Sequence, residues 1–494
     1  MRNYPRFLGL FALVASVVSV PMLGQQAARA DARLPAPSIF PAPGTYFNTT
    51  SLSLMDAVPG TEIHYTWDGS EPNAASPVFD PRGVLFIAGL YDGSKGLKTG
   101  YTLRAVAMKT GLQASEPATF AYQIERRDRT AYVSEEVAPG VRMIRDSDND
   151  KMFLLRGTKS CALIDSGQGR GALRDYVSQF TGGLPLVAIW THSHGDHIGQ
   201  ADQFIAGSKE YVGEADRQAV ADFLERHGAS RDQIAEHLES VRDGSKIELG
   251  DRELEIVTVP GHTPGSIVVF DPAGGNLFTG DTFGNNSYLP PDVLWMQWPD
   301  QPPLDHYFAA VHTARAMLGD RVKLIMTGHN DHPLTGTKYL DNLETALQRA
   351  MDEGSAALVP SYRPPGLQQI VVGDRFTDPN WFGMNVNAQT FLPAPPDQIA
   401  SLTIIDVKGA TLTGRFASTV HDYHAIVSRG AHRKITITVR PTSSRIQSLT
   451  LDGEAVRWGS PHEVSFKGSS RTVPIVVTAH DGKTTDTYRL TLAE

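Results

Sequence analysis

The sequence predicts a multidomain chain in which a central, layered α/β domain lies between two smaller all-β sandwiches. Length is the first observation, because the 494 residues exceed what one hydrophobic core supports; a domain typically holds about 100–200 residues. Patterning is the second: strand-like alternation fills both ends of the chain, whereas strands alternate with amphipathic helices in the middle. A hydrophobic content of 41% with 20% charged residues is typical of a folded chain rather than a disordered one.

The first 30 residues have the pattern of a secretory signal peptide. Arg2 and Arg6 precede an apolar run over 7–20, and the sequence Ala-Arg-Ala at 28–30 supplies a small-x-small cleavage site. The run is shorter than the ~20 apolar residues of a membrane span, and an uncleaved anchor is the alternative. We expect cleavage after Ala30, a periplasmic or secreted mature protein and no membrane span.

Residues 31–126 are predicted to form the first sandwich. After a Pro- and Ala-rich linker, the runs 61–67 and 101–107 alternate polar and apolar side chains, as half-buried strands do. The sequences HYTWDGS at 64–70 and LRAVA at 103–107 resemble the immunoglobulin-like domain appended to chitobiases and hexosaminidases. That resemblance implies a spacer, docking or glycan-contacting role and no chemistry.

Residues 127–355 are predicted to form the α/β domain, because β-rich runs alternate there with runs of helical apolar spacing. The expected strands include 186–190, 254–259 and 322–326, and the expected helices are 214–241, 304–318 and 338–353. Gly319 and Gly354 stand where helix C-caps belong. The first helical stretch is either a lid over the site or, as its charged residues favour, a solvated pair of helices.

Two further segments complete the chain. Residues 356–396 are Pro-rich and are expected to be a linker or extension whose Trp381, Phe382 and Met384 pack on the α/β domain. Residues 397–494 return to strand-like alternation. The clearest expected strands there are 434–439, 473–478 and 488–492. This last segment resembles a cadherin-like β-sandwich.

Charge and cysteine content exclude several classes of site and partner. The formal net charge is -9, which disfavours a nucleic-acid partner, because proteins that bind nucleic acid carry a basic patch or stripe. The single cysteine, Cys161, excludes a disulfide within the chain and zinc sites built from several thiolates. The 16 histidines therefore remain to supply any metal site.

The strongest chemical signal is the run 191–197, which reads THSHGDH and directly follows an apolar strand. Neutral imidazole and carboxylate are ligands for zinc or iron. Because the end of a strand fixes the backbone, His192 and His194 can clasp one ion while Asp196 and His197 turn toward a second. The alternative is a polar loop with chance histidines, which four ligand-type residues at this spacing disfavour.

Further ligand-type residues stand at the ends of other expected strands. Three of them, His262, Asp281 and His329, each follow a glycine, which allows close approach of the backbone. Upstream, Asp165 follows the apolar pair Leu163-Ile164 in the same way. Four separate segments therefore carry the same strand-then-ligand pattern as the first motif.

These motifs resemble those of the metallo-β-lactamase-fold hydrolase superfamily over about residues 130–350. The resemblance implies an αββα sandwich, with two mixed sheets face to face, helices outside and metals at one rim. It also implies a role for each motif residue: His192, His194 and His262 hold one metal, Asp196, His197 and His329 hold the second, Asp281 bridges the two, and Asp165 orders the ligand loops.

The resemblance also narrows the branch of the superfamily. An aspartate at the bridging position is typical of the glyoxalase II, lactonase and phosphodiesterase branches, and antibiotic-degrading members usually lack it. Quorum-sensing lactonases carry a tyrosine shortly after it, where this chain has Gly284 and its nearest tyrosine is Tyr288. His194 disfavours the flavodiiron-type oxidoreductases, which have glutamate there.

Together these features predict an exported hydrolase with two divalent metal ions. Zinc is the default metal, with iron or manganese as alternatives, because all the ligands are nitrogen or oxygen. Two cations about 3.5–4 Å apart share a hydroxide and lower its pKa, and the catalytic carboxylates would be Asp196, which orients the nucleophile, and Asp281. A serine hydrolase is disfavoured, because Gly265-Ser266 lacks the G-x-S-x-G elbow.

The expected bond is a carboxylic ester, lactone or thioester in a small organic or glycan-linked substrate. The alternatives are a phosphodiester, sulfate ester or β-lactam bond, oxidation by a single iron, and a glycan-binding scaffold with a relic site. Candidate pocket residues are Asn285, Asn286, Tyr288, Trp295 and Trp298, for which a turn cap or core packing is the plainer explanation. The oligomeric state stays open.

Overall fold

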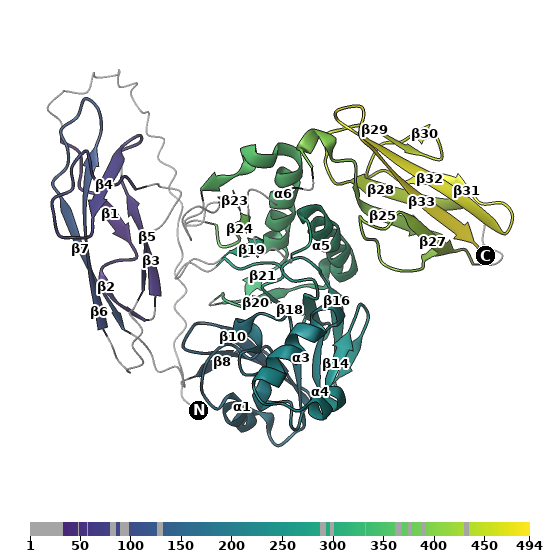
Figure 1. Ribbon diagram of the computed structural model, residues 1–494, viewed down its shortest axis with the longest axis horizontal. Coiled ribbons are helices and arrows are strands. Elements are labelled where there is room, and N and C mark those ends of the chain that lie inside the picture. The colour runs from purple at the N-terminus through teal and green to yellow at the C-terminus, as the bar shows by residue number, and fades with distance from the viewer. Residues whose placement is uncertain are drawn as a thin grey trace, which may run out of the picture.

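The structure is a computed structural model in which three domains follow one another along the chain (Figure 1). It describes residues 33–47, 49–56, 58–79, 85–88, 98–125, 132–286, 293–296, 301–330, 332–360, 368–373, 378–386, 392, 394–428 and 434–494. The predicted signal peptide and its cleavage site after Ala30 lie outside these residues. Within the ranges described, no helix is long and apolar enough to cross a membrane.

The central domain is built on two mixed sheets that pack face to face. The first has the strand order β14-β13-β12-β11-β10-β9-β8 and the second β15-β16-β17-β18-β20-β21. Their bounds are β8 Val133–Ala138, β9 Val141–Arg145, β10 Lys151–Arg156, β11 Cys161–Ile164, β12 Leu186–Trp190, β13 Glu210–Gly213, β14 Leu238–Val241, β15 Lys246–Glu248, β16 Glu253–Thr258, β17 Ile267–Asp271, β18 Asn276–Gly280, β20 Leu324–Thr327 and β21 Leu334–Thr335. Apolar side chains from both sheets fill the space between them; the ring centroids of Phe153 and Phe278, for example, lie 5.2 Å apart.

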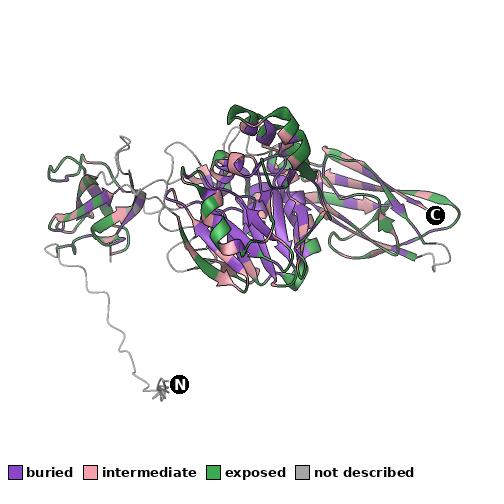
Figure 2. Ribbon diagram, turned by 90° about the horizontal axis from the view of Figure 1, so that it is seen from below, coloured by how far each residue is buried: buried purple, intermediate pink, exposed green. Residues whose placement is uncertain are grey.

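Helices cover the two outer faces. Helices α1 (Leu173–Thr181), α3 (Arg217–Arg226) and α4 (Arg231–His237) lie on the first sheet, and α5 (Leu304–Leu318) and α6 (Lys338–Glu353) lie on the second. The predicted αββα sandwich is therefore confirmed, and burial is deepest in its two sheets (Figure 2). Helices α5 and α6 begin and end at the predicted residues, with Gly319 and Gly354 at positive φ directly after them.

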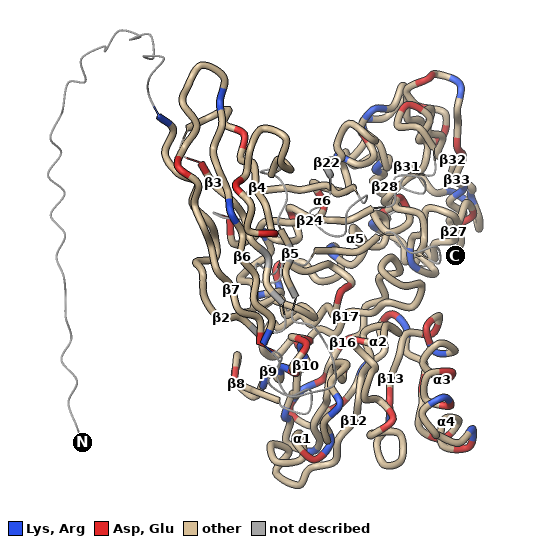
Figure 3. Tube along the Cα trace, turned by 60° about the vertical axis from the view of Figure 1, so that its left-hand side comes forward, with Lys and Arg blue, Asp and Glu red and all other residues tan. Residues whose placement is uncertain are grey.

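The stretch predicted as helix over 214–241 differs in its last part. Its helices α3 and α4 pack on the first sheet through Val220, Leu224 and Ile234, and both carry acidic and basic side chains (Figure 3). Residues 238–241 are instead strand β14, which pairs in parallel with β13 at the sheet edge. The helical prediction was wrong there, because pairing with a distant strand overrides local spacing.

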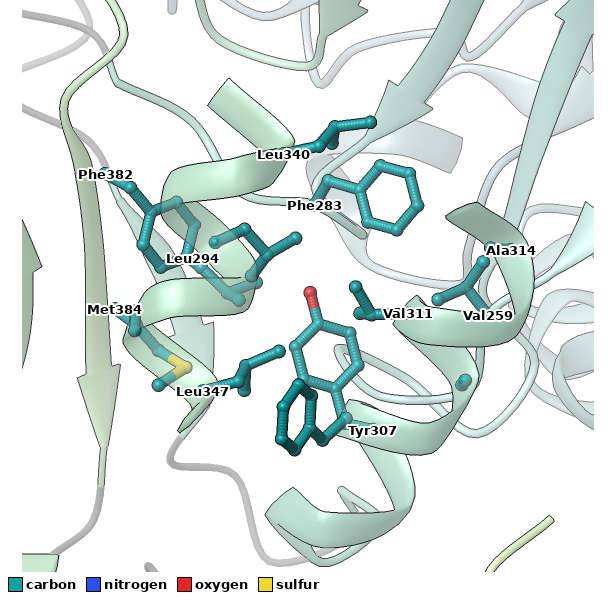
Figure 4. Close-up of a cluster of buried hydrophobic side chains, with 14 of the residues drawn as sticks. Val259, Phe283, Leu294, Tyr307, Val311, Ala314, Leu340, Leu347, Phe382 and Met384 are labelled. Carbon is teal, nitrogen blue, oxygen red and sulfur yellow. The ribbon is translucent and has the colours of Figure 1, made fainter. Parts of the chain in front are cut away.

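The Pro-rich segment 356–396 contributes to a third, smaller sheet. Its strand order is β19-β24-β23-β22, with bounds β19 Leu294–Met296, β22 Val359–Pro360, β23 Gln368–Val372 and β24 Phe382–Val386. Trp381, Phe382 and Met384 are buried, as the sequence analysis expected, but the strands themselves were not predicted. Figure 4 shows Phe382 and Met384 beside Leu294 and facing Tyr307 of α5. The segment is therefore part of the core of the central domain.

Both flanking domains are β-sandwiches, as predicted. The N-terminal one pairs the sheets β1-β3-β5 and β2-β7-β6-β4, and the C-terminal one pairs β25-β28-β31 with β26-β27-β33-β32-β29-β30. Their bounds are β1 Ser38–Phe40, β2 Gly44–Phe47, β3 Thr49–Met55, β4 Glu62–Thr66, β5 Leu85–Ala88, β6 Lys98–Met108, β7 Ala118–Glu125, β25 Leu402–Lys408, β26 Thr411–Leu412, β27 Asp422–Ile426, β28 Lys434–Pro441, β29 Ile446–Leu451, β30 Glu454–Ala455, β31 His462–Ser465, β32 Ser470–Ala479 and β33 Thr485–Ala493. Each encloses its own apolar core.

A buried carboxyl group anchors the strand that leads into the first metal-ligand motif. Glu210 of β13 is fully buried, and its Oε2 accepts a 2.8 Å hydrogen bond from Nε1 of Trp190, the last residue of β12. Burial raises the pKa of Glu210 to about 8, so the carboxyl group stays protonated at neutral pH. This hydrogen bond fixes the end of β12 against its neighbour.

Glu210→Gln should remove a pH dependence from stability. Between the ordinary pKa of 4.5 and about 8, the unfolded carboxyl loses its proton while the folded one keeps it. The free energy of unfolding therefore falls with rising pH, by at most ~1.4 kcal/mol per pH unit. Glutamine can still accept the hydrogen bond from Nε1 of Trp190 and does not titrate. As the pH rises through this window, the free energy of unfolding of the variant should therefore increase relative to that of the parent. Urea unfolding at both ends of the window measures the difference, and parallel pH profiles would contradict the assignment.

Candidate metal centre

The chain directions of four strands bring the ligand-type side chains to one rim of the two sheets. His192 follows β12, Asp281 follows β18 and His329 follows β20, while a short turn after β16 leads to His262. His194 is the N-cap residue of the short helix α2 (Gly195–Ile198), which contains Asp196 and His197. Strands β18 and β20 are parallel neighbours, so their carboxyl ends, and the ligands after them, lie side by side.

The seven residues form two groups, and within each group the ligand atoms all lie within 4.8 Å of one another. The first group contains His192, His194 and His262, and the second contains Asp196, His197, Asp281 and His329. In the first group, Nδ1 of His194 is 2.9 Å from Nε2 of His262. The resemblance implies the same two sets of side chains, except that it assigns Asp281 to both metals.

Asp281 lies between the two groups. One of its oxygens, Oδ1, is 3.4 Å from Nε2 of His197, and the other, Oδ2, is 3.4 Å from Nε2 of His329. Oδ2 is also 3.9 Å from Nε2 of His262, which belongs to the first group. Although burial opposes ionisation, His329 and His197 hold the pKa of Asp281 well below its usual range. An ionised carboxylate in this place is suited to contact two cations.

The donor set fits metal ions. Nε2 of His192 and Nε2 of His197 are buried and have no hydrogen-bond partner among the described residues. Burial lowers the pKa of His192 well below its ordinary value, so this imidazole is neutral, the form that binds metals. Since buried polar nitrogens in proteins nearly always have a partner, a cation bound in each group would give both of these atoms one. The nitrogen and oxygen ligands suit zinc, iron or manganese.

Asp165 holds the second group from behind. Its Oδ2 lies 2.8 Å from Nδ1 of His197 and accepts a 2.8 Å hydrogen bond from Oγ1 of Thr191, while Oδ1 accepts from the Thr191 amide at 2.8 Å. These contacts turn Nε2 of His197 toward the ligand group. A carboxylate behind a metal-binding imidazole fixes its orientation and raises its basicity. The structure thus places Asp165 where the resemblance implies.

Two further buried carboxylates serve the ligand loops, and the sequence analysis missed both. Oδ2 of Asp216 accepts from the Ser193 amide at 2.9 Å and from Oγ1 of Thr263 at 2.6 Å, and Oδ1 accepts from the Gly265 amide at 2.7 Å. It thereby ties the loop of His192 and His194 to the loop of His262. Asp216 stands before a helix with no ligand spacing, so no local signal marked it.

Asp150 is the second of these carboxylates. Its Oδ1 lies 3.3 Å from Nδ1 of His329, and its Oδ2 accepts from the Gln168 amide at 3.2 Å. It belongs to the run DSDND at 146–150, between β9 and β10. This acidic run was the available signal, because five polar or acidic residues between two buried strands need a structural reason.

The structure describes three of the five candidate pocket residues, namely Asn285, Asn286 and Trp295. Asn285 is fully buried; its Nδ2 donates to Oδ1 of Asp281 and its Oδ1 accepts from the His329 amide, both at 3.1 Å. Asn286 is buried as well and bonds to Asn330, so both asparagines support ligand loops.

The tryptophans and the tyrosine complete that set. The carbonyl oxygen of Trp295 lies 3.0 Å from Nδ1 of His262, and its side chain is half-buried. Trp295 therefore orients a ligand through its backbone, a role that the sequence analysis did not consider. Tyr288 and Trp298 lie outside the described residues.

Comparison with known families gives three matches. The metallo-beta-lactamase superfamily model matches residues 151–329, the chitobiase/beta-hexosaminidase C-terminal domain matches 41–119, and the cadherin-like beta sandwich domain matches 399–493. These matches confirm the three resemblances drawn from the sequence. Together with the two packed sheets, the first match shows that the central domain has the metallo-β-lactamase fold.

Curated relatives match the same domain. The chain is 28% identical over 179 residues to acyl-coenzyme A thioesterase MBLAC2 of Homo sapiens, covering 30% of this chain and 63% of that one. It is 34% identical over 143 residues to hydroxyacylglutathione hydrolase of Synechocystis sp., covering 26% and 49%. The chain therefore spans less than two thirds of the length of these relatives.

Solved structures show lower identity. A metallo-beta-lactamase from Pontibacter korlensis is 16% identical with a TM-score of 0.35, covering 44% of this chain and 98% of that one. The sec-alkylsulfatase Pisa1 from Pseudomonas sp. is 18% identical with a TM-score of 0.35, covering 44% and 42%.

Asp216→Asn should weaken metal binding. Both carboxylate oxygens accept from N–H or O–H donors, so either orientation of the amide sets its NH₂ group against a donor. Loss of such a supporting carboxylate typically lowers metal affinity about 10–100-fold. Titration against a chromophoric chelator measures the affinity. The matched control is Asp222→Asn on the exposed side of α3. An equal metal affinity in both variants would refute the role of Asp216 in holding the two ligand loops together.

Proposed function

We propose that this chain is an exported, dinuclear metal-dependent hydrolase that cleaves a thioester or carboxylic ester, with zinc as its metal. The observation that carries the proposal is the pair of ligand groups with Asp281 between them. A structural metal site is usually closed by four ligands around one ion, whereas this arrangement offers ligands for two neighbouring ions at the rim of the sheets. Neighbouring cations are suited to activate a nucleophile and stabilise a leaving oxygen.

The chain's own side chains would divide the work at this centre. When bound, the two cations would supply the Lewis acidity that polarises a carbonyl group and acidifies water. Asp196 is the most accessible of the carboxylates, with 34% of its side chain exposed, and its Oδ2 is 3.5 Å from Nε2 of His329. It is therefore placed to orient an entering water and to accept its proton. Asp281 is nearly buried and would hold the two halves of the site together.

The choice of bond rests on the curated relatives. Those named above are an acyl-coenzyme A thioesterase and a hydroxyacylglutathione hydrolase, and both names denote the hydrolysis of an acyl group from a thiol-bearing carrier. The predicted signal peptide disfavours glutathione thioesters, which are mostly cytosolic. We therefore propose an extracytoplasmic thioester or carboxylic ester, including lactones, as the substrate class.

A hydrolysis screen of residues 31–494 tests this function. The panel contains thioester, carboxylic ester, lactone, phosphodiester, sulfate ester and β-lactam probes, each with and without a chelator. We expect turnover of a thioester or carboxylic ester that a chelator abolishes and zinc restores. Turnover of another substrate class alone would overturn the bond assignment, and no hydrolysis of any probe with iron bound would favour the oxidation alternative.

Mass spectrometry of the exported protein tests cleavage after Ala30.

Two substitutions should abolish activity without unfolding the domain. His194→Ala removes a ligand atom of the first group, and Asp196→Asn removes the carboxylate that would accept the proton. Because general base catalysis alone contributes about 10²–10⁴-fold, kcat should fall by at least ~100-fold in both. His227→Ala, an exposed histidine on the same domain, is the matched control. Full activity in both variants, with metal content and circular dichroism recorded, would end the proposal.

A further inference from the structure

We propose that the C-terminal sandwich is a fixed part of the catalytic unit and that Arg415 is a positioning residue for the His262 loop. The inference rests on the proposed function only in taking His262 as a metal ligand. Four observations carry it: the contacts of Arg415, the strand that they fix, the helix that they reach, and the apolar seam between the two domains.

Arg415 lies in the C-terminal domain and makes its hydrogen bonds to the central one. Its Nη1 is 3.0 Å and 2.9 Å from the two carboxylate oxygens of Asp243. The same atom contacts the carbonyl oxygen of Thr258 and lies 3.1 Å from Oγ1 of that threonine. Its Nη2 donates to the carbonyl oxygen of Ala310 at 3.0 Å. Only 18% of the side chain is exposed. The planar guanidinium thus links three segments of the neighbouring domain.

Arg415 contacts strand β16, which leads to His262. Thr258 is the last residue of β16, and His262 follows four residues later. Oδ1 of Asp243 accepts from the Thr258 amide at 2.6 Å and from its Oγ1 at 2.9 Å. Arg415 therefore completes a closed network around the end of the strand. Charged hydrogen bonds of this kind are about twice as strong as neutral ones.

Helix α5 carries the same restraint to both ligand groups. Three residues before Ala310, the ring of Tyr307 packs against Gly261, where a Cβ atom would lie 2.0 Å from the tyrosine Cδ2. The Tyr307 hydroxyl donates to the carbonyl oxygen of Thr282, directly after Asp281, at 2.7 Å. A shift of α5 would therefore move the neighbours of both His262 and Asp281.

An apolar seam holds α5 to the C-terminal sandwich. Ala309 of α5 is buried in the core of that sandwich together with Leu402 and Ile405 of β25. A second polar contact lies at the end of α6. The carboxylate of Asp352 accepts hydrogen bonds of 2.7–3.0 Å from Ser443 and Ser444, and the backbone carbonyl oxygen of Asp352 accepts one of 2.9 Å from Nη1 of Arg445. This second contact reaches no ligand loop, so it offers a matched control.

The test compares Arg415→Met with Arg445→Met in the full chain. Both variants remove one arginine from the same interface, but only the first touches β16. Hydrogen exchange of a peptide spanning 253–263 is measured in the metal-free protein, and zinc affinity is measured by competition with a chelator. We expect Arg415→Met to exchange faster in this peptide and to bind zinc about 10-fold more weakly, while Arg445→Met matches the parent in both.

Several outcomes would overturn the proposal. Unchanged exchange and affinity in Arg415→Met would show that the sandwich is an independent module, and equal losses in both variants would show a general interface effect. If Arg415→Met fails to fold, Arg415→Lys keeps the charge beside Asp243 and loses the fork to Ala310, and it should show the same changes at smaller size. Hydrogen exchange does not depend on hydrolysis, so a failure of the proposed function leaves this result readable.

Discussion

The central domain depends on keeping ligand nitrogens free of ordinary hydrogen bonds in a buried place. A buried imidazole with an unpartnered nitrogen is unfavourable unless its other nitrogen is held, and here each such group has a holder. The two ligand imidazoles with such a nitrogen are His197, whose Nδ1 is held by Asp165, and His192, whose Nδ1 lies 3.1 Å from Oγ1 of Thr191. Asp150 and the carbonyl of Trp295 contact Nδ1 of His329 and of His262 in the same way. The architecture around the rim follows from placing these holders, because they come from distant parts of the chain.

This requirement explains why so many elements end at the same rim. Each of the four strand ends contributes at least one ligand, and turns beside the ligands are fixed by a carboxylate or amide from another segment, as Asp216 fixes Ser193 and Gly265. Glycines stand where a side chain would separate the partners: a Cβ atom on Gly265 would lie 2.2 Å from the Asp216 amide nitrogen. Close backbone packing and ligand geometry are therefore one constraint, which a single bulky substitution would break.

Features encoded within a few residues were predictable, and features that rest on distant pairing were not. The strand-glycine-ligand pattern at His262 or His329 is local, as are the glycine C-caps that placed the ends of α5 and α6. Asp216, by contrast, meets its partners 23 to 49 residues away, and nothing beside it in the chain announces this. Strand β14 and, in the third sheet, the pairing of β19 with β24 likewise depend on partner strands far along the chain.

Helix α5 carries a sign of the domain coupling in its own sequence. A helix that covers one face of a sheet has one apolar stripe, and a helix that is apolar all round is enclosed. Leu304, Tyr307, Phe308, Ala309, Ala310, Val311, His312, Ala314 and Leu318 of α5 are all buried, and they point in every direction around its axis. One side meets the second sheet and another meets the C-terminal sandwich. The central domain without that sandwich would therefore expose apolar surface on the helix that packs against the His262 and Asp281 loops.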